Sequence, residues 1–143
     1  MEVTLEKMRE FAAQFVARLP KVPGEKAHIV GLSGDLGAGK TTFVQHVARE
    51  LGVKEQVTSP TFVIAQAYQT THPLFTRLVH TDAYRLEGET KDTVGFEEFS
   101  HDPHTLMLVE WPEKLPREAI FPADASVLKF EVVDDNTRNI SYA

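Results

Sequence analysis

Apolar positions in the first part of the chain predict a helix, a buried strand and a second helix. Over residues 4–19 the apolar side chains recur at the spacing of an amphipathic helix. A short apolar run at residues 27–33 is typical of a buried strand. Residues 41–51 again carry apolar side chains on one helical face, and Gly52 is suited to end that helix. A buried strand therefore leads into a helix through a short connection.

The rest of the chain favours strands, because β-branched, aromatic and aliphatic residues gather in short runs between turn residues. Strands that alternate with few helices predict one α/β domain over residues 1–143, with three layers and a mixed sheet. The expected elements are a hairpin of strands 62–68 and 74–81 around a turn at 71–73, a short helix near 89–94, a buried strand at 105–109, and a closing hairpin of strands 127–133 and 137–142.

Composition narrows the classes of function. The chain has 143 residues, with 15 lysines and arginines against 21 acidic residues and a net charge of −6. This acidic balance argues against autonomous nucleic-acid binding, which needs a cationic face. The absence of cysteine excludes a disulfide scaffold, a cysteine-ligated zinc site and a cysteine nucleophile. Without a signal-peptide pattern or an apolar run of about 20 residues, we expect a cytoplasmic protein that does not enter a membrane.

The connection between the first strand and the second helix carries the clearest chemical signal. The phosphate-loop pattern G-x-x-x-x-G-K-[ST] is matched at every fixed position by Gly34-Asp35-Leu36-Gly37-Ala38-Gly39-Lys40-Thr41. Small residues let backbone N–H groups converge on phosphate oxygens, and the helix N-terminus directs its dipole at the same charge. We expect these residues and Thr42 to surround the phosphates of a nucleotide. Lys40 reaches the β- and γ-phosphates, and the Thr41 hydroxyl binds Mg²⁺.

Two carboxylates follow apolar strands at positions where they can supply a further Mg²⁺ ligand. Asp82 follows residues 74–81, and Glu110 follows residues 105–109. Both are expected at the carboxyl end of the sheet, where open α/β sheets bind ligands. The spacing alone does not assign their roles. His80 shares a strand face with Asp82, and is either a core histidine or a residue that orients Asp82 or the attacking water.

Other residues have both a structural and a functional interpretation. Ser59 and Thr61 flank Pro60, which favours extended backbone before it. They either sense a γ-phosphate, as switch segments do, or lead into the next strand. Arg85 either meets phosphate, a carboxylate or a partner, or forms an ordinary surface ion pair. Trp111 follows Glu110 and either packs or takes part in the site.

Five motifs, taken in order and spacing, resemble one known family. They are G-D-L-G-A-G-K-T-T-F at 34–43, S-P-T-F at 59–62, H-T-D-A-Y-R-L at 80–86, G-F-E-E-F at 95–99 and V-E-W-P-E at 109–113. Together they resemble the TsaE family, the small bacterial ATPases of tRNA threonylcarbamoyladenosine biosynthesis. One position departs from the family pattern, because Gln66 stands where a glutamate often follows the S-P-T-F segment.

The resemblance implies a P-loop NTPase-like α/β fold with a mixed, largely antiparallel sheet, and slow hydrolysis of ATP with Mg²⁺. It gives Lys40 and Thr41 the phosphate and Mg²⁺ roles. It makes Glu110 a metal-linked residue and Asp82 a residue needed for hydrolysis, and it aligns Arg138 with the adenine site. It also implies the partners TsaD and TsaB, which transfer the threonylcarbamoyl group to ANN-decoding tRNAs, so tRNA is expected only within that complex.

Three functions fit these residues. The first is an ATPase that resets its partner complex between turnovers. The second is a small-molecule kinase, although such kinases usually add a lid with clustered arginines, whereas the arginines here are scattered. The third is a nucleotide-dependent adaptor without catalysis. The products separate them: free phosphate, a phosphorylated metabolite, or neither.

Overall fold

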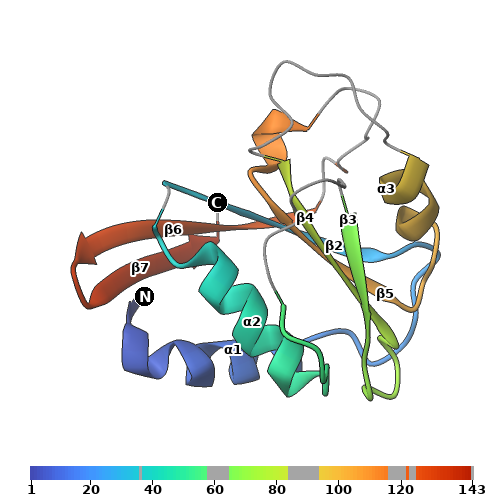
Figure 1. The fold of residues 1–143 in the computed structure, drawn as a ribbon, viewed down its shortest axis with the longest axis horizontal. Coiled ribbons are helices and arrows are strands. Elements are labelled where there is room, and N and C mark those ends of the chain that lie inside the picture. Colours follow the sequence, from blue (N-terminus) through green and yellow to red (C-terminus); the bar gives the residue numbers. More distant parts are fainter. Residues whose placement is uncertain (36, 58–64, 84–93, 116–121, 123–124, 143) are drawn as a thin grey trace.

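A seven-stranded sheet runs through the molecule in the order β1-β7-β6-β2-β5-β4-β3 (Figure 1). The computed structural model describes residues 1–35, 37–57, 65–83, 94–115, 122 and 125–142. The strands are β1 Glu2–Thr4, β2 His28–Gly34, β3 Ala65–Gln69, β4 Arg77–Asp82, β5 Thr105–Glu110, β6 Ser126–Asp134 and β7 Thr137–Tyr142. The helices are η1 Leu5–Lys7, α1 Met8–Ala17, α2 Lys40–Glu50, α3 Val94–Ser100 and η3 Pro112–Lys114.

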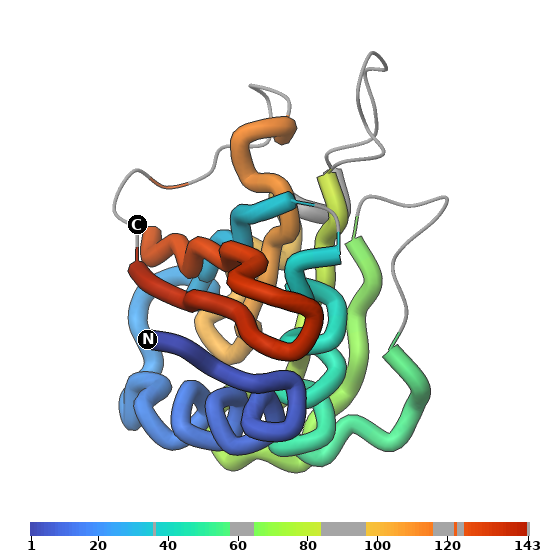
Figure 2. The backbone as a smooth tube through the Cα atoms, turned by 90° about the vertical axis from the view of Figure 1, so that its left-hand side faces the viewer, coloured from blue at the N-terminus to red at the C-terminus, as the bar shows by residue number. Residues whose placement is uncertain are grey.

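The sheet is parallel at its centre and antiparallel at its edges. β2 pairs in parallel with β6 and β5, and β5 pairs in parallel with β4. The antiparallel pairings are β1 with β7, β7 with β6, and β4 with β3. The predicted mixed α/β fold is therefore confirmed, while antiparallel pairing is confined to the edges and is less dominant than the resemblance implied. Figure 2 shows β1 lying against the β6–β7 hairpin.

Helices cover both faces of the sheet, which confirms the predicted three layers. On one face, α1 and α2 bury the larger apolar core, together with alternate residues of β2, β5 and β6. Phe43 of α2 lies at its centre, with its ring 5.3 Å from that of Phe15 and 5.5 Å from that of Phe130. On the opposite face, Phe99 of α3 packs against a smaller cluster that includes Met107. None of the described helices is long and apolar enough to cross a membrane.

Most predicted elements are observed, with shifted ends. The helix expected at residues 4–19 is divided into η1 and α1, and Thr4 caps the first turn by accepting a hydrogen bond from the Lys7 N–H at 3.3 Å. The three-residue strand β1 was not predicted, because so short a segment shows no period. The helix expected near residues 89–94 falls on residues outside those described, except Val94, where α3 begins.

The second strand of the β3–β4 hairpin starts three residues later than expected, at Arg77 rather than Leu74. Side-chain hydrogen bonds hold the preceding residues in the turn. His72 Nδ1 accepts from the N–H groups of Leu74 and Phe75 at 3.1 and 3.0 Å, and the Thr70 hydroxyl donates to the Phe75 carbonyl at 2.5 Å. Apolar residues at 74 and 75 therefore belong to the turn and not to the strand.

This turn makes stability depend on pH. Nδ1 of His72 can accept hydrogen bonds only when it is unprotonated, and burial, with a smaller effect from Lys21, lowers the pKa of His72 below its usual value. A group whose pKa is lowered by folding binds fewer protons in the folded state than in the unfolded state. The contribution of His72 to the free energy of unfolding is therefore present above about pH 6.5 and is lost as the pH falls. We expect His72→Asn, whose amide oxygen can accept at a similar position, to reduce this pH dependence.

The measurement is urea unfolding between pH 5 and pH 7. As the pH falls over this interval, the free energy of unfolding should decrease more for the wild-type protein than for His72→Asn. The remaining histidines titrate in both proteins, so the difference between them reports His72. His72→Ala, which removes the acceptor, should lower the free energy of unfolding by about 1 kcal/mol at pH 7. Equal pH slopes for the wild type and His72→Asn would contradict this account.

Candidate functional site

The predicted phosphate loop connects the C-terminal end of β2 to the N-terminal end of α2. Gly34, Gly37 and Gly39 have φ angles of 135°, 79° and 96°, in the left-handed region that favours glycine. The N-cap residue of α2 is Gly39, which has no side chain to cap the helix, and the backbone N–H of Phe43 donates to the Gly39 carbonyl at 2.9 Å to start the helical hydrogen bonds. The first-turn N–H groups of a helix have no intrahelical partner, and such groups commonly bind anions.

Two features require a glycine at position 34: its backbone angle and the close approach of the neighbouring strand β6. Gly34 is the last residue of β2 and is paired with Phe130 of β6. A Cβ at Gly34 would overlap the backbone carbonyl oxygen of Phe130. By contrast, a Cβ at Gly37 would meet no described atom within 4 Å. The base of the loop is therefore tightly packed against β6, whereas no described atom crowds the position of a Cβ at Gly37.

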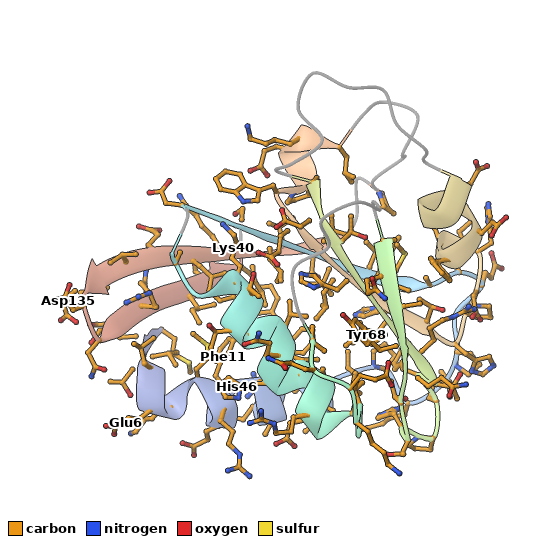
Figure 3. The ribbon with its side chains drawn as sticks, in the orientation of Figure 1. Glu6, Phe11, Lys40, His46, Tyr68 and Asp135 are labelled. Carbon is orange, nitrogen blue, oxygen red and sulfur yellow. The ribbon has the colours of Figure 1, made fainter. Side chains whose placement is uncertain are left out.

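Lys40 brings a buried ammonium group into this loop. Its side chain donates to the carbonyl oxygens of Gly34 and Asp35, the latter at 3.2 Å, and only 4% of the residue is exposed. The ammonium also lies 4.1 Å from the centre of the Trp111 ring, a cation–π contact. Burial lowers the pKa of Lys40, and nearby carboxylates, first that of Glu110, offset part of this shift. Figure 3 labels Lys40 at the start of α2.

Trp111 reaches Lys40 because the chain turns sharply after β5. Its φ angle of 58° places it in the left-handed region, the one such non-glycine residue in the described chain. This conformation is costly for a large side chain and persists where the surroundings determine it. Here the backbone N–H of Trp111 donates to the Leu32 carbonyl of β2 at 3.0 Å, which fixes the turn. Of the two interpretations of Trp111, the structure therefore favours contact with the site.

Glu110 is the carboxylate that contacts the phosphate-loop threonine. It is the last residue of β5 and is 3% exposed. The Thr41 hydroxyl donates to its two carboxylate oxygens, at 2.9 and 3.1 Å. The same carboxylate lies 2.5 Å from Nε2 of His80, a fully buried residue of β4. His80 thus contacts Glu110, a partner that sequence reasoning did not consider for it.

Asp82 ends β4 directly beside Glu110. The two residues are paired in the parallel register of β4 and β5, and the charges of both raise the pKa of Lys40. The expectation that both carboxylates meet at one edge of the sheet is therefore correct. This edge is the upper end of β4 and β5 in Figure 1, close to η3. The hairpin turn that contains His72 lies at the opposite end of these strands (Figure 1).

Arg138 of β7 reaches the outside of the phosphate loop. Its guanidinium donates to the Gly37 carbonyl at 3.3 Å and to the carbonyls of Asp134 and Thr137 at 2.9 and 3.2 Å. The resemblance aligned this residue with the adenine site, whereas the observed bonds hold the loop against the β6–β7 hairpin. A buried arginine on a late strand gives no sequence signal for such a contact.

The remaining candidate residues divide into three groups. Asp35 and Thr42 are exposed beside the loop, and Ala38 is buried with its N–H donating to the Asp35 carbonyl at 3.1 Å. Gln66 lies on β3 with an exposed side chain. The candidate residues Leu36, Ser59, Thr61 and Arg85 lie outside those that the structure describes.

The donor set at this edge fits Mg²⁺ better than a transition metal. Within the described residues, no group of three or more His, Cys, Asp or Glu side chains is arranged to hold a metal ion. A hydroxyl and a carboxylate, those of Thr41 and Glu110, lie together instead. Mg²⁺ prefers such hard oxygen donors and commonly binds through one or two protein ligands, with phosphates and waters completing its shell. The arrangement can therefore hold a phosphate–Mg²⁺ pair.

Comparison with known proteins gives a consistent result. The family model for "Threonylcarbamoyl adenosine biosynthesis protein TsaE" matches residues 3–140. Proteins named tRNA threonylcarbamoyladenosine biosynthesis protein TsaE are similar to this chain. That of Treponema pallidum is 35% identical over 136 residues, covering 92% of this chain and 96% of its own. That of Bacillus subtilis is 39% identical over 110 residues, covering 73% and 66%. The crystal structure of YdiB from Bacillus subtilis superposes with a TM-score of 0.67 at 27% identity, covering 99% of this chain and 83% of that one.

The contrast between two loop glycines gives a test of the site's construction. Gly37→Ala should cost about 1 to 2 kcal/mol of unfolding free energy, from backbone strain alone. Gly34→Ala adds the overlap with Phe130 and should cost about 2 to 5 kcal/mol in total. Urea denaturation of both variants measures the difference. Equal losses would show that the approach of β6 does not constrain the loop.

Proposed function

The chain belongs to the TsaE family of threonylcarbamoyl adenosine biosynthesis proteins, and from this premise we propose that it is a weak Mg²⁺-dependent ATPase of tRNA threonylcarbamoyladenosine biosynthesis. One observation carries the proposal. A complete phosphate loop holds Lys40 at the sheet edge where the Thr41 hydroxyl lies 2.9 Å from a carboxylate oxygen of Glu110. A phosphate-binding loop, a lysine ammonium that meets the phosphates and a carboxylate that can bind Mg²⁺ are parts that recur in enzymes transferring a phosphoryl group from a nucleoside triphosphate.

The loop binds the phosphates through its backbone. First-turn N–H groups of α2 and the left-handed glycines present donors to phosphate oxygens. Lys40 counters the charge of the β- and γ-phosphates, exchanging its bonds to the Gly34 and Asp35 carbonyls for stronger charged acceptors. Arg138 holds the loop at Gly37 while this exchange occurs.

Thr41 and Glu110 would hold Mg²⁺ beside the phosphates. When bound, the ion neutralises charge that develops on the transferred group. Asp82, paired with Glu110 across the strands, orients or deprotonates the attacking water. Among the described residues, the arginine that reaches the loop is Arg138, and its hydrogen bonds go to backbone carbonyls. The proposed intrinsic hydrolysis is slow, as the resemblance to the TsaE family implies.

The partners are TsaD- and TsaB-type proteins, and ATP turnover resets their complex between modification cycles. Ser59 and Thr61, the candidate switch residues, report the nucleotide state to them. With a net charge of −6, the chain does not bind tRNA by itself and meets it only within the complex. Partner docking is the expected stimulus for turnover.

Removal of the buried cation tests the phosphate role. Lys40→Met keeps most of the side-chain volume but removes the charged hydrogen bonds, so the Kd for ATP should rise about 10- to 100-fold. Isothermal titration calorimetry measures the change. Lys54→Ala, an exposed lysine beyond the end of α2, is the matched control and should leave the Kd unchanged. Unaltered binding in Lys40→Met would refute the phosphate role.

Substitution of Asp82 separates binding from hydrolysis. Asp82→Asn should bind Mg·ATP normally, while phosphate release, alone and with TsaD and TsaB, falls by about 100-fold or more. Asp135→Asn, at the tip of the β6–β7 hairpin far from Lys40 (Figure 3), is the control and should be silent. A phosphorylated metabolite among the products would favour a kinase. ATP-dependent partner binding without any phosphate release would favour an adaptor.

A further inference from the structure

His80 is a fully buried polar side chain that the proposed hydrolysis does not use. Alternate residues of a strand share a face, so Leu78, His80 and Asp82 lie in line on β4. Leu78 belongs to the apolar core beneath α1 and α2. Asp82 lies at the polar edge of the sheet. His80, with 0% exposure, stands at the boundary between this core and the candidate site.

The hydrogen bond of His80 connects it to the candidate Mg²⁺ ligand. Its Nε2 lies 2.5 Å from Glu110 Oε2, the oxygen that also accepts from the Thr41 hydroxyl at 2.9 Å. A carboxylate oxygen accepts, so both neighbours donate to it. The Glu110 side chain is thus held by residues of β4 and of the first turn of α2.

An imidazole at this position costs free energy that an apolar side chain would avoid. The other ring nitrogen of His80, Nδ1, is buried and has no hydrogen-bond partner among the residues that the structure describes. A buried polar atom without a partner is destabilising, and a leucine would continue the apolar face begun by Leu78. Within the described part of the chain, the contact with Glu110 is the interaction that offsets this cost.

We propose that His80 is a positioning residue that orients the Glu110 carboxylate to hold Mg²⁺ beside Thr41. The inference rests on the proposed function, because it requires a Mg·ATP site. A glutamate side chain fixed in advance loses less conformational freedom when the metal binds. Hydrogen-bond partners of metal ligands commonly contribute about 10- to 100-fold to metal affinity.

The test measures Mg²⁺ binding rather than turnover. The affinity for a non-hydrolysable ATP analogue is followed by calorimetry at a series of free Mg²⁺ concentrations. His80→Leu should raise the Mg²⁺ concentration that gives half of the Mg²⁺-dependent gain in affinity, by about 10- to 100-fold. Affinity for the analogue in EDTA should stay at the wild-type value, because the loop and Lys40 are unchanged.

A pair of amide variants distinguishes positioning from packing. His80→Gln offers an N–H donor at a reach similar to that of Nε2 and should restore the wild-type Mg²⁺ requirement. His80→Asn is one methylene shorter, does not reach Glu110 and should behave like His80→Leu. If His80→Leu does not fold, this pair decides the question.

Three outcomes overturn the inference. They are an unchanged Mg²⁺ requirement in His80→Leu, a loss of analogue affinity in EDTA in that variant, and equal Mg²⁺ requirements in His80→Gln and His80→Asn. In each case a wild-type protein that binds the analogue with Mg²⁺ leaves the proposed function standing. A wild-type protein that binds no analogue at all contradicts the proposed function and this inference together.

Discussion

The buried ammonium of Lys40 is the constraint on which the arrangement of the site depends. A charge removed from water needs close compensation, or it is destabilising or loses its proton. Here the compensation comes from two backbone carbonyls of the loop, from the ring of Trp111 and from neighbouring carboxylates. The first two require unusual local structures: the loop contains left-handed glycines, and a left-handed turn after β5 brings in the ring. The geometry of the loop and of the turn are therefore two parts of one solution.

The carboxylates that stabilise Lys40 also determine what else the site needs. Asp82 and Glu110 end adjacent strands, and both act on Lys40 through their charges. Two negative groups beside a polyphosphate would repel it unless a further cation lay between them. The Thr41 hydroxyl, already in contact with Glu110, supplies the second oxygen for such an ion. The proposed Mg²⁺ would therefore offset the negative charges at this edge, as well as those of the phosphates.

The parts of the molecule that could be predicted are those whose signal is local. The phosphate loop needs only its own residues, and the apolar runs before Asp82 and Glu110 place them at strand ends. Hydrogen bonds from side chains are less visible, so Leu74 and Phe75 were expected in a strand although His72 holds them in a turn. The strand β1 is too short for a pattern and exists because β7 offers it a partner. Secondary-structure propensity describes a segment by itself, whereas the turn and the strand β1 depend on contacts of that segment with other residues.

Contacts between distant residues depend on strand register, which the sequence does not state. The sequence allowed His80 to orient Asp82, its neighbour on β4, and did not indicate that the parallel register with β5 also brings its ring to Glu110. A slip of one residue would turn either strand over and send its carboxylate to the α3 face. Leu78 and Leu108, which precede these carboxylates on the same strands, are buried on the α2 face. They oppose that slip because it would remove them from the apolar core. The packing of the sheet therefore selects which polar groups meet at its edge, and the chemistry of the site follows from the burial of residues that take no part in it.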